Sequence, residues 1–110
     1  MSPVEFYKCL ADDTRLKSLL LITLQGELCV CDLMDALEVS QPKVSRHLAE
    51  LRKCELLVDE RRGKWVYYQL NPKLPSWSKT VLQETASATS AFLKISLIKL
   101  KRAQKSRVCC

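Results

Sequence analysis

The sequence contains a single histidine, His47, and no long hydrophobic segment. The aliphatic run Leu19–Ile22 is far shorter than the roughly 20 residues that cross a bilayer as a helix. The first residues also lack the basic start and apolar stretch of a signal peptide. We therefore expect a soluble, cytoplasmic protein with no membrane partner. A single imidazole also excludes a metal site built from several histidines.

Acidic residues are scarce in the second half of the chain. Residues 1–40 carry three basic and seven acidic groups, whereas residues 41–110 carry fifteen basic and five acidic groups, and the net charge is +6. This asymmetry suits attraction to a polyanion, either nucleic acid or an anionic membrane surface. At 110 residues the chain has room for one domain with a modest core, to which a second subunit can add.

Two helices are expected at the start of the chain. The first covers residues 3–10, because Pro3 can open a helix. The second begins after Asp12 or Asp13, either of which can cap it, and ends at Gly26.

The next segment changes its spacing at a cysteine pair. Leu28 and Val30 alternate with Cys29 and Cys31, so both thiols are expected on the strand face opposite the apolar residues. Helical spacing resumes from Asp32, which places Cys31 at the cap of a short helix. Cysteine caps a helix poorly as a thiol, so another reason for its presence is expected.

A helix over residues 40–51, SQPKVSRHLAEL, shows a clear division into two faces. Ser40 can cap it, and Pro42 lies in its first turn, where a missing N–H costs nothing. Its apolar stripe consists of Val44, Leu48 and Leu51. The opposite face is polar and mostly cationic, and consists of Lys43, Arg46, His47 and Glu50, with Gln41 and Ser45 near the N-terminal end.

After Leu57 the pattern alternates as in strands. The segments LLVDE and WVYYQL flank RRGK, in which Gly63 suits a tight turn. The prediction is a β-hairpin with a basic tip formed by Arg61, Arg62 and Lys64.

One long helix with two apolar stripes is expected from Ser76 to about Ala103. One stripe can face the chain's own core, and the other, with small residues between Ala86 and Ala91, can pack against a second subunit. A homodimer through terminal helices is therefore predicted. The residues from Lys101 are expected to form a flexible basic tail beyond a domain of residues 1–100. The stripes are Trp77, Val81, Ala88, Phe92 and Ile95, and Leu82, Ala86, Leu93, Leu97 and Leu100.

Two helices in close succession followed by a basic hairpin are the order of a mainly α winged helix-turn-helix with a small β-hairpin wing. Its second helix enters the major groove, and its wing reaches an adjacent phosphate or the minor groove. The alternative is a solvated helix and a charged turn in an unrelated domain, but the order of elements favours DNA. The candidate DNA contacts are Ser40, Gln41, Lys43, Ser45, Arg46, His47, Arg61, Arg62 and Lys64.

Cys29 and Cys31 form a Cys-x-Cys motif at a helix start. The positive end of the helix dipole favours thiolates there, which suits a soft metal or metalloid. The alternative is a pair of small buried apolar residues. Cys109 and Cys110 are vicinal and form a second candidate site, with an incidental reactive tail as the alternative.

The other two cysteines, Cys9 and Cys54, are expected to be structural, although either could supply a third ligand. Thiols stay reduced in the cytoplasm, so the six cysteines are better explained as ligands, reactive groups or core residues than as a disulfide frame.

Several segments between about residues 6 and 77 resemble the ArsR/SmtB family of winged-helix metalloregulators, and within it the arsenical resistance repressors. These segments are FYKCLADDTRLKSLLLI, GELCVCDLMDAL, SQPKVSRHLAELRKCELL and RRGKWVYYQLNPKLPSW. The resemblance implies a homodimeric repressor rather than an enzyme. Such a repressor binds operator DNA without inducer and leaves it when trivalent arsenic or antimony binds the cysteines before the recognition helix.

Met34 departs from the family pattern. The family has a third cysteine there, one helical turn after the second, so Cys29 and Cys31 supply only two of the three thiolates that inorganic arsenite prefers. Cys9, Cys54 or the tail could supply another. Alternatively, the inducer needs only two thiolates, as a methylated trivalent arsenical would.

Other positions bear on the inducer. The end Cys109–Cys110 resembles sensors of this superfamily that bind trivalent arsenicals through vicinal cysteines. Glu55 stands where relatives place a glycine that ends the recognition helix. Zinc sensors of the family use acidic and histidine residues on the last helix, where this chain offers only Glu84, so no zinc site is expected. Cadmium or lead sensors add cysteines from an N-terminal arm, for which only Cys9 is available.

Two further functions fit a cysteine-rich chain. A thiol-redox-responsive repressor of the same fold would leave DNA on oxidation without a metalloid. A small thiol enzyme or metal carrier would use Cys29 and Cys31, but the sequence gives it no catalytic base near a nucleophile and no reason for the SQPKVSRH face.

Overall fold

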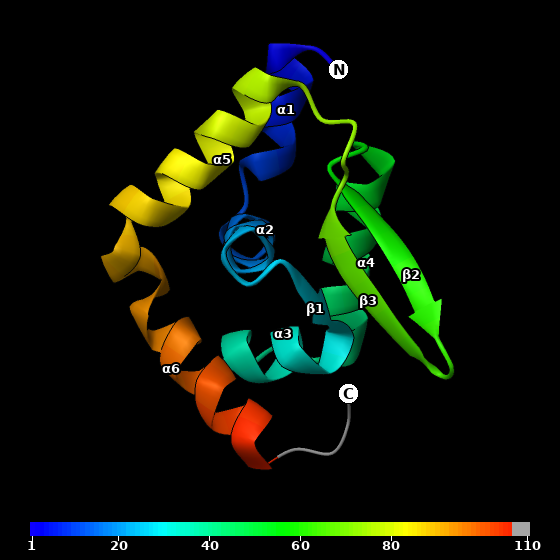
Figure 1. Ribbon diagram of the computed structural model, residues 1–110, viewed down its shortest axis with the longest axis vertical. Helices are drawn as coiled ribbons and strands as arrows, with labels where there is room; N and C mark the ends of the chain where they lie inside the picture. The colour runs from blue at the N-terminus through cyan, green and yellow to red at the C-terminus, as the bar shows by residue number, and fades with distance from the viewer. Residues whose placement is uncertain (107–110) are drawn as a thin grey trace.

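The computed structural model describes residues 1–106 and shows a mainly helical chain with one three-stranded antiparallel sheet (Figure 1). This order confirms the predicted winged helix-turn-helix, in which α3 and α4 form the helix pair and β2 and β3 the wing. Within residues 1–106, no helix is both long and apolar enough to span a bilayer. In chain order the elements are α1 (Pro3–Leu10), α2 (Asp13–Gln25), β1 (Glu27–Cys29), α3 (Val30–Leu37), α4 (Gln41–Lys53), β2 (Leu57–Arg62), β3 (Trp65–Leu70), α5 (Ser76–Ala88) and α6 (Ser90–Ser106).

The ends of α2 follow from its cap residues. The Asp12 carboxylate accepts a hydrogen bond from the backbone N–H of Arg15 at 2.9 Å, which satisfies one of the open donors of the first turn. Gly26 ends the helix with a φ of 89°, a conformation that disfavours a β-carbon. The predicted limits of this helix are confirmed.

The core surrounds α2, which lies at the centre of the molecule (Figure 1). Leu19–Ile22 is fully buried, and so is the predicted stripe of α4 at Val44, Leu48 and Leu51. Leu24 was expected on the inward stripe of α2, but its side chain is 43% exposed, because α2 ends there next to solvent. The recognition helix is therefore held by its apolar stripe against the centre of the domain.

The wing is joined to a third strand, β1. The strand order is β1-β3-β2, and Cys29 in β1 lies opposite Tyr67 in β3. In the hairpin, Arg62 lies opposite Trp65, and Gly63 in the turn has a φ of 64°. The strand that ends at the cysteine motif is thus hydrogen-bonded to the wing.

The terminal segment differs from the single helix that the spacing predicts. Thr89 interrupts it with φ −113° and ψ 42°, between α5 and α6. The Thr85 hydroxyl donates to the carbonyl of Val81 at 2.6 Å, and the Thr89 hydroxyl donates in turn to the carbonyl of Thr85. Such side-chain bonds compete with the helical ladder and bend helices.

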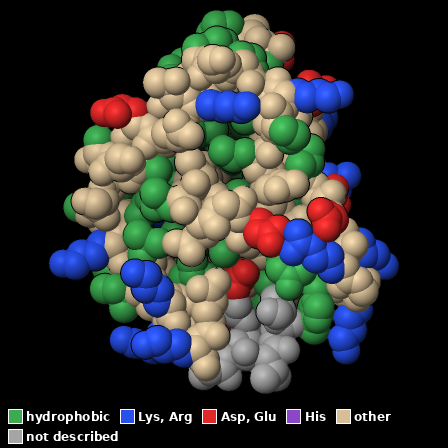
Figure 2. All heavy atoms as spheres, in the orientation of Figure 1, with side chains coloured by type: hydrophobic (Ala, Val, Ile, Leu, Met, Phe, Trp, Pro, Cys, Tyr) green, Lys and Arg blue, Asp and Glu red, His purple; other side chains and the backbone are tan. Residues whose placement is uncertain are grey.

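The C-terminal end of α6 also differs from the prediction. This helix continues to Ser106, so residues 101–106 are helical where a flexible tail was expected to begin. The motif Cys109–Cys110 lies outside the residues that the structure describes. Figure 2 shows Lys and Arg side chains both along α6 and around the wing.

The two apolar stripes on the terminal helices are confirmed. Leu82, Leu93 and Leu100 are buried against the rest of the domain, where α5 packs on α2 and α6 on α3 (Figure 1). The other stripe includes Trp77, 39% exposed, and Ile95, 66% exposed. A row of large apolar side chains therefore lies on the surface of the described protein.

Cys9 and Cys54 form a disulfide bond, which corrects the expectation that the cysteines stay reduced. The two residues lie 45 positions apart in sequence and meet because α1 packs near the C-terminal end of α4. No local pattern reports such a tertiary contact. In this form neither sulfur can serve as a third ligand beside Cys29 and Cys31.

Candidate DNA interface and thiol site

The recognition helix α4 presents the predicted polar face to solvent. Gln41, Lys43, Ser45 and Arg46 are all exposed, and Ser40, the N-cap residue, is exposed beside them. Amide, hydroxyl and guanidinium groups at the N-terminal end of a helix can donate to base edges and phosphates in a major groove.

His47 does not lie on this polar face, contrary to the prediction. Its side chain is only 9% exposed, and its Nε2 lies 3.7 Å from Oδ2 of Asp12. Burial lowers the pKa of His47 below its ordinary value of 6.5, although Asp12 opposes this shift. Nδ1 of His47 is a buried side-chain nitrogen that has no hydrogen-bond partner among the described residues. His47 thus joins α4 to the start of α2 and is not placed to contact DNA.

Arg62 fastens the wing to β1. Two of its nitrogens donate to the two carboxylate oxygens of Glu27 at 2.8 and 2.7 Å, and its Nε donates to Glu60 at 2.8 Å. Its guanidinium also lies 4.5 Å from the ring centroid of Tyr67. These carboxylates raise the pKa of Arg62, and the hydrogen bond from Arg62 lowers the pKa of Glu27. The predicted phosphate contact at Arg62 therefore has a structural partner already.

The rest of the wing tip is exposed. Arg61 precedes Arg62 in β2, and Lys64 follows the turn, with its ammonium 5.4 Å from the ring centroid of Trp65. Both can reach phosphates of a bound duplex.

The cysteine motif lies where β1 turns directly into α3. The helix begins at Val30 with Cys29 as its N-cap, two positions earlier than the predicted start at Asp32. The Asp32 carboxylate accepts the backbone N–H of Cys29 at 3.0 Å, which closes the first turn. Because the strand ends at Cys29, alternation does not continue, and Cys29 is as buried as Leu28 instead of lying on the opposite face.

Both cysteines of the motif already have interaction partners, and none of the described cysteines is a free thiol. A thiophilic ligand must therefore meet the reduced form of this protein. Among the described residues, no group of three His, Cys, Asp or Glu side chains is arranged to hold a metal ion.

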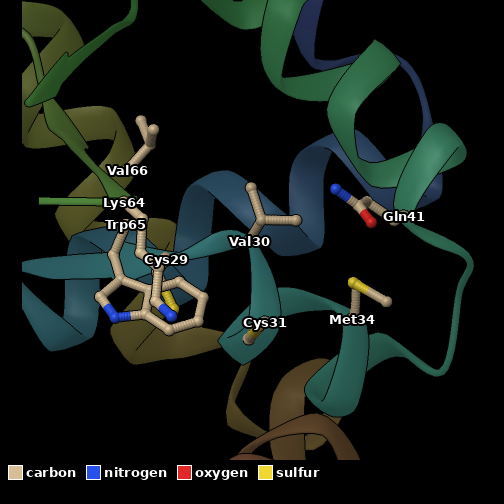
Figure 3. A pocket seen from close by; sticks show the side chains of 8 residues that line it. All are labelled: Cys29, Val30, Cys31, Met34, Gln41, Lys64, Trp65 and Val66. Carbon is tan, nitrogen blue, oxygen red and sulfur yellow. The ribbon is translucent and has the colours of Figure 1, made fainter. Parts of the chain in front are cut away.

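A pocket of about 400 Å³ opens beside the motif (Figure 3). In Figure 3 the Trp65 indole lies next to Cys29, and Met34 lies on the turn of α3 that follows Cys31. Sequence analysis placed Trp65 only in an alternating strand, because the pairing of β1 with β3 that brings it here has no local signal. The lining residues are Cys29, Val30, Cys31, Met34, Gln41, Lys64, Trp65 and Val66.

Comparison with known proteins identifies relatives along the whole chain. The sequence profile described as "Bacterial regulatory protein, arsR family" matches residues 12–58. The chain is 50% identical to the arsenic resistance transcriptional regulator ArsR2 of Pseudomonas putida, over 100% of this chain and 99% of that protein. It is 54% identical to the arsenical resistance operon repressor of Escherichia coli, over 74% of this chain and 70% of that protein.

The fold is also similar to that of a solved regulator. HlyU of Vibrio cholerae superposes with a TM-score of 0.70 at 30% identity, over 78% of this chain and 86% of that chain. Profile, relatives and fold agree with the exposed helix and wing described above. The chain belongs to the ArsR family of bacterial regulatory proteins, and it is a winged-helix, DNA-binding transcriptional repressor and not an enzyme.

Proposed function

We propose that this protein is a cytoplasmic, homodimeric repressor whose affinity for its operator falls when trivalent arsenic or antimony binds the reduced thiols of Cys29 and Cys31. One observation carries the proposal: a single pocket touches both cysteines, Gln41 at the start of the recognition helix and Lys64 in the wing. Relatives from Pseudomonas putida and Escherichia coli that are named for arsenic resistance support this inducer class.

The proposed contacts with DNA divide between two elements. The N-terminal part of α4 enters the major groove, and the wing tip neutralises phosphates through Arg61 and Lys64. His47 and Arg62 are left out, because the one is buried and the other is bound to Glu27 and Glu60. The groove contacts are Ser40, Gln41, Lys43, Ser45 and Arg46.

The exposed apolar stripe of α5 and α6 is the proposed dimer contact. Trp77 packs edge-to-face on Phe6 with ring centroids 5.0 Å apart, so α1 borders the same surface. Covering this stripe with a second copy removes large apolar side chains from water. A two-fold dimer also places two recognition helices on successive turns of the major groove.

Inducer binding can reach the wing through β1. Cys29 pairs with Tyr67 in the sheet, and Glu27, two residues earlier, holds Arg62 of the wing. A displacement of β1 at the cysteines therefore moves the strand to which the wing is attached.

A second route leads from α3 to the dimer helix. Gln104 in α6 donates to Asp32 at 3.4 Å, and Lys99 in α6 pairs with Glu38 at 2.7 Å. A shift of α3 would alter the spacing of the two recognition helices in a dimer. Reversing a 99-to-1 preference between two states requires a differential affinity of about 5.5 kcal/mol, which thiolate bonding can supply.

The test is release of a fluorescent operator duplex, followed by anisotropy on the reduced full-length chain. Arsenite and antimonite are expected to lower the anisotropy to that of free DNA, while cadmium is expected to do so only at higher concentration. No release by any trivalent arsenical or by antimonite would refute the proposed inducer class.

A second candidate function, thiol-redox control, is favoured by the Cys9–Cys54 disulfide. It predicts a change in operator affinity between oxidised and reduced protein in the absence of any metalloid. A peroxide arm in the same titration distinguishes the two mechanisms.

A further inference from the structure

We propose that the pocket beside Cys29 and Cys31 receives the organic substituent of a trivalent organoarsenical, so that the preferred inducer has one carbon bonded to arsenic. The inference rests on the proposed function, since it uses the same two thiols. It narrows the inducer from trivalent arsenic in general to the class R–As(III).

The number of available thiols argues for this class. Trivalent arsenic makes three bonds, and Met34 stands one helical turn after Cys31, where a third thiol would be needed. A thioether has no proton to exchange and cannot become a thiolate. Cys9 and Cys54 are bonded to each other, and the described residues hold no cluster of three ligands.

The reaction balances with two thiols. An organoarsenous acid, R–As(OH)₂, reacts with the two thiols to give R–As(S-Cys)₂ and two molecules of water. Two As–O and two S–H bonds break, two As–S and two O–H bonds form, the As–C bond is kept, and no electrons are transferred. Arsenite reacting at the same pair would retain one As–OH group.

The walls of the pocket suit carbon better than hydroxyl. Val30, Met34, Trp65 and Val66 present apolar side chains around the cysteines (Figure 3). A volume of about 400 Å³ lies in the range of small-molecule sites and leaves room for an aromatic ring as well as a methyl group. Burying that substituent favours binding, whereas an As–OH group would have to be desolvated there.

The position of the pocket gives the substituent a role in release. Gln41 and Lys64, two proposed DNA contacts on separate elements, line the same pocket. A ring that occupies the space between them opposes the arrangement in which both meet one duplex. Larger substituents are therefore expected to release DNA at least as well as methyl.

The experiment compares phenylarsine oxide with arsenite in the anisotropy assay, using reduced full-length chain that carries Cys109→Ser/Cys110→Ser so that the terminal pair cannot bind either probe. Phenylarsine oxide is expected to release the operator at a concentration on the order of tenfold lower than arsenite. Half-release by arsenite at an equal or lower concentration would overturn this inference and leave the proposed function standing. Failure of both probes would overturn both.

Variants at Met34 provide the matched control. Met34→Cys supplies a third thiol and is expected to lower the arsenite concentration needed by about tenfold or more, with little change for phenylarsine oxide. Met34→Leu keeps an apolar wall without a thiol and is expected to keep the preference of the parent chain. If Met34→Cys leaves the arsenite response unchanged, the two-thiol explanation is wrong.

Binding is also read without DNA. Trp77→Phe leaves Trp65 as the single tryptophan of the chain. Its fluorescence is expected to change with phenylarsine oxide at one equivalent, and Cys29→Ser/Cys31→Ser is expected to abolish this change. A change that persists in the double variant would place the probe on another thiol pair, and no change in the parent would show that the pocket stays empty.

Discussion

Arg61 and Arg62 are adjacent in the wing, yet their surroundings differ. Arg62 donates to both oxygens of Glu27, whereas Arg61 is exposed at the tip. Charge pattern alone predicts a phosphate contact for each. Only the cross-strand partner, which lies 35 residues away in sequence, separates their roles.

Arg61→Ala is expected to weaken operator binding and to lower the slope of log affinity against log salt by about one, as for the loss of one phosphate contact. Arg62→Ala is expected to leave that slope unchanged, because its charge is already paired. Operator affinity measured over a series of salt concentrations checks both. Equal losses of slope in the two variants would contradict the assignment.

His47 gives the domain a pH-dependent stability. Its folded-state pKa lies below the unfolded value of 6.5, so the unfolded chain binds the additional proton. The free energy of unfolding is therefore expected to fall as the pH drops below about 6.5 and through the folded pKa, and to be unaffected by this residue at higher pH.

Urea denaturation of wild type and His47→Gln at pH values from 7.5 to 5.5, roughly spanning this window, measures the effect. The wild type is expected to lose more stability than the variant over that interval. Parallel pH dependences in the two proteins would show that His47 does not titrate as its burial implies.

At the level of secondary structure, the elements of the DNA interface could be predicted and their linkage could not. The helix over residues 40–51 and the hairpin have strong local signals, in apolar spacing and in a glycine turn. The break at Thr89 depends on two threonine side chains that bond back onto the helix, which a hydrophobic pattern does not report.

The thiol site was likewise predicted in part. Its two cysteines stand out in sequence, but Trp65 and Lys64 reach it only because β1 pairs with β3. A strand of three residues is too short to be recognised from alternation, and the predicted orientation of Cys29 was wrong for the same reason.

Disruption of the apolar stripe tests the dimer. Ile95→Lys places a charge on an exposed position of α6 and is expected to yield a monomer with much weaker operator binding, because one recognition helix then binds alone. Gln83→Lys adds the same charge at an exposed position of α5 outside the stripe and is the matched control.

Light scattering gives the masses of both variants in solution. A monomeric mass for the Ile95→Lys variant alone is the expected result. A wild-type chain that is itself monomeric at micromolar concentration would refute the homodimer.

For the whole molecule, the Cys9–Cys54 bond joins the first helix to the end of the recognition helix. A cross-link over this separation typically stabilises a domain by about 2–4 kcal/mol, chiefly by restricting the unfolded chain. Cys9→Ser and Cys54→Ser are each expected to lose that stability in oxidising buffer and to match the wild type in the presence of reductant. Denaturation curves in both buffers measure it, and equal stabilities in oxidising buffer would show that the bond does not form in solution.

The central claim is that the thiols of Cys29 and Cys31 control a DNA interface formed by α4 and the wing. The most direct measurement is operator release by a trivalent arsenical, followed on the reduced Cys29→Ser/Cys31→Ser chain beside Cys109→Ser/Cys110→Ser and wild type. We expect the first variant to bind the operator as wild type does and to stay bound at every arsenical concentration that releases the other two. Normal release of the Cys29→Ser/Cys31→Ser variant would contradict the claim and place the inducer site elsewhere in the chain.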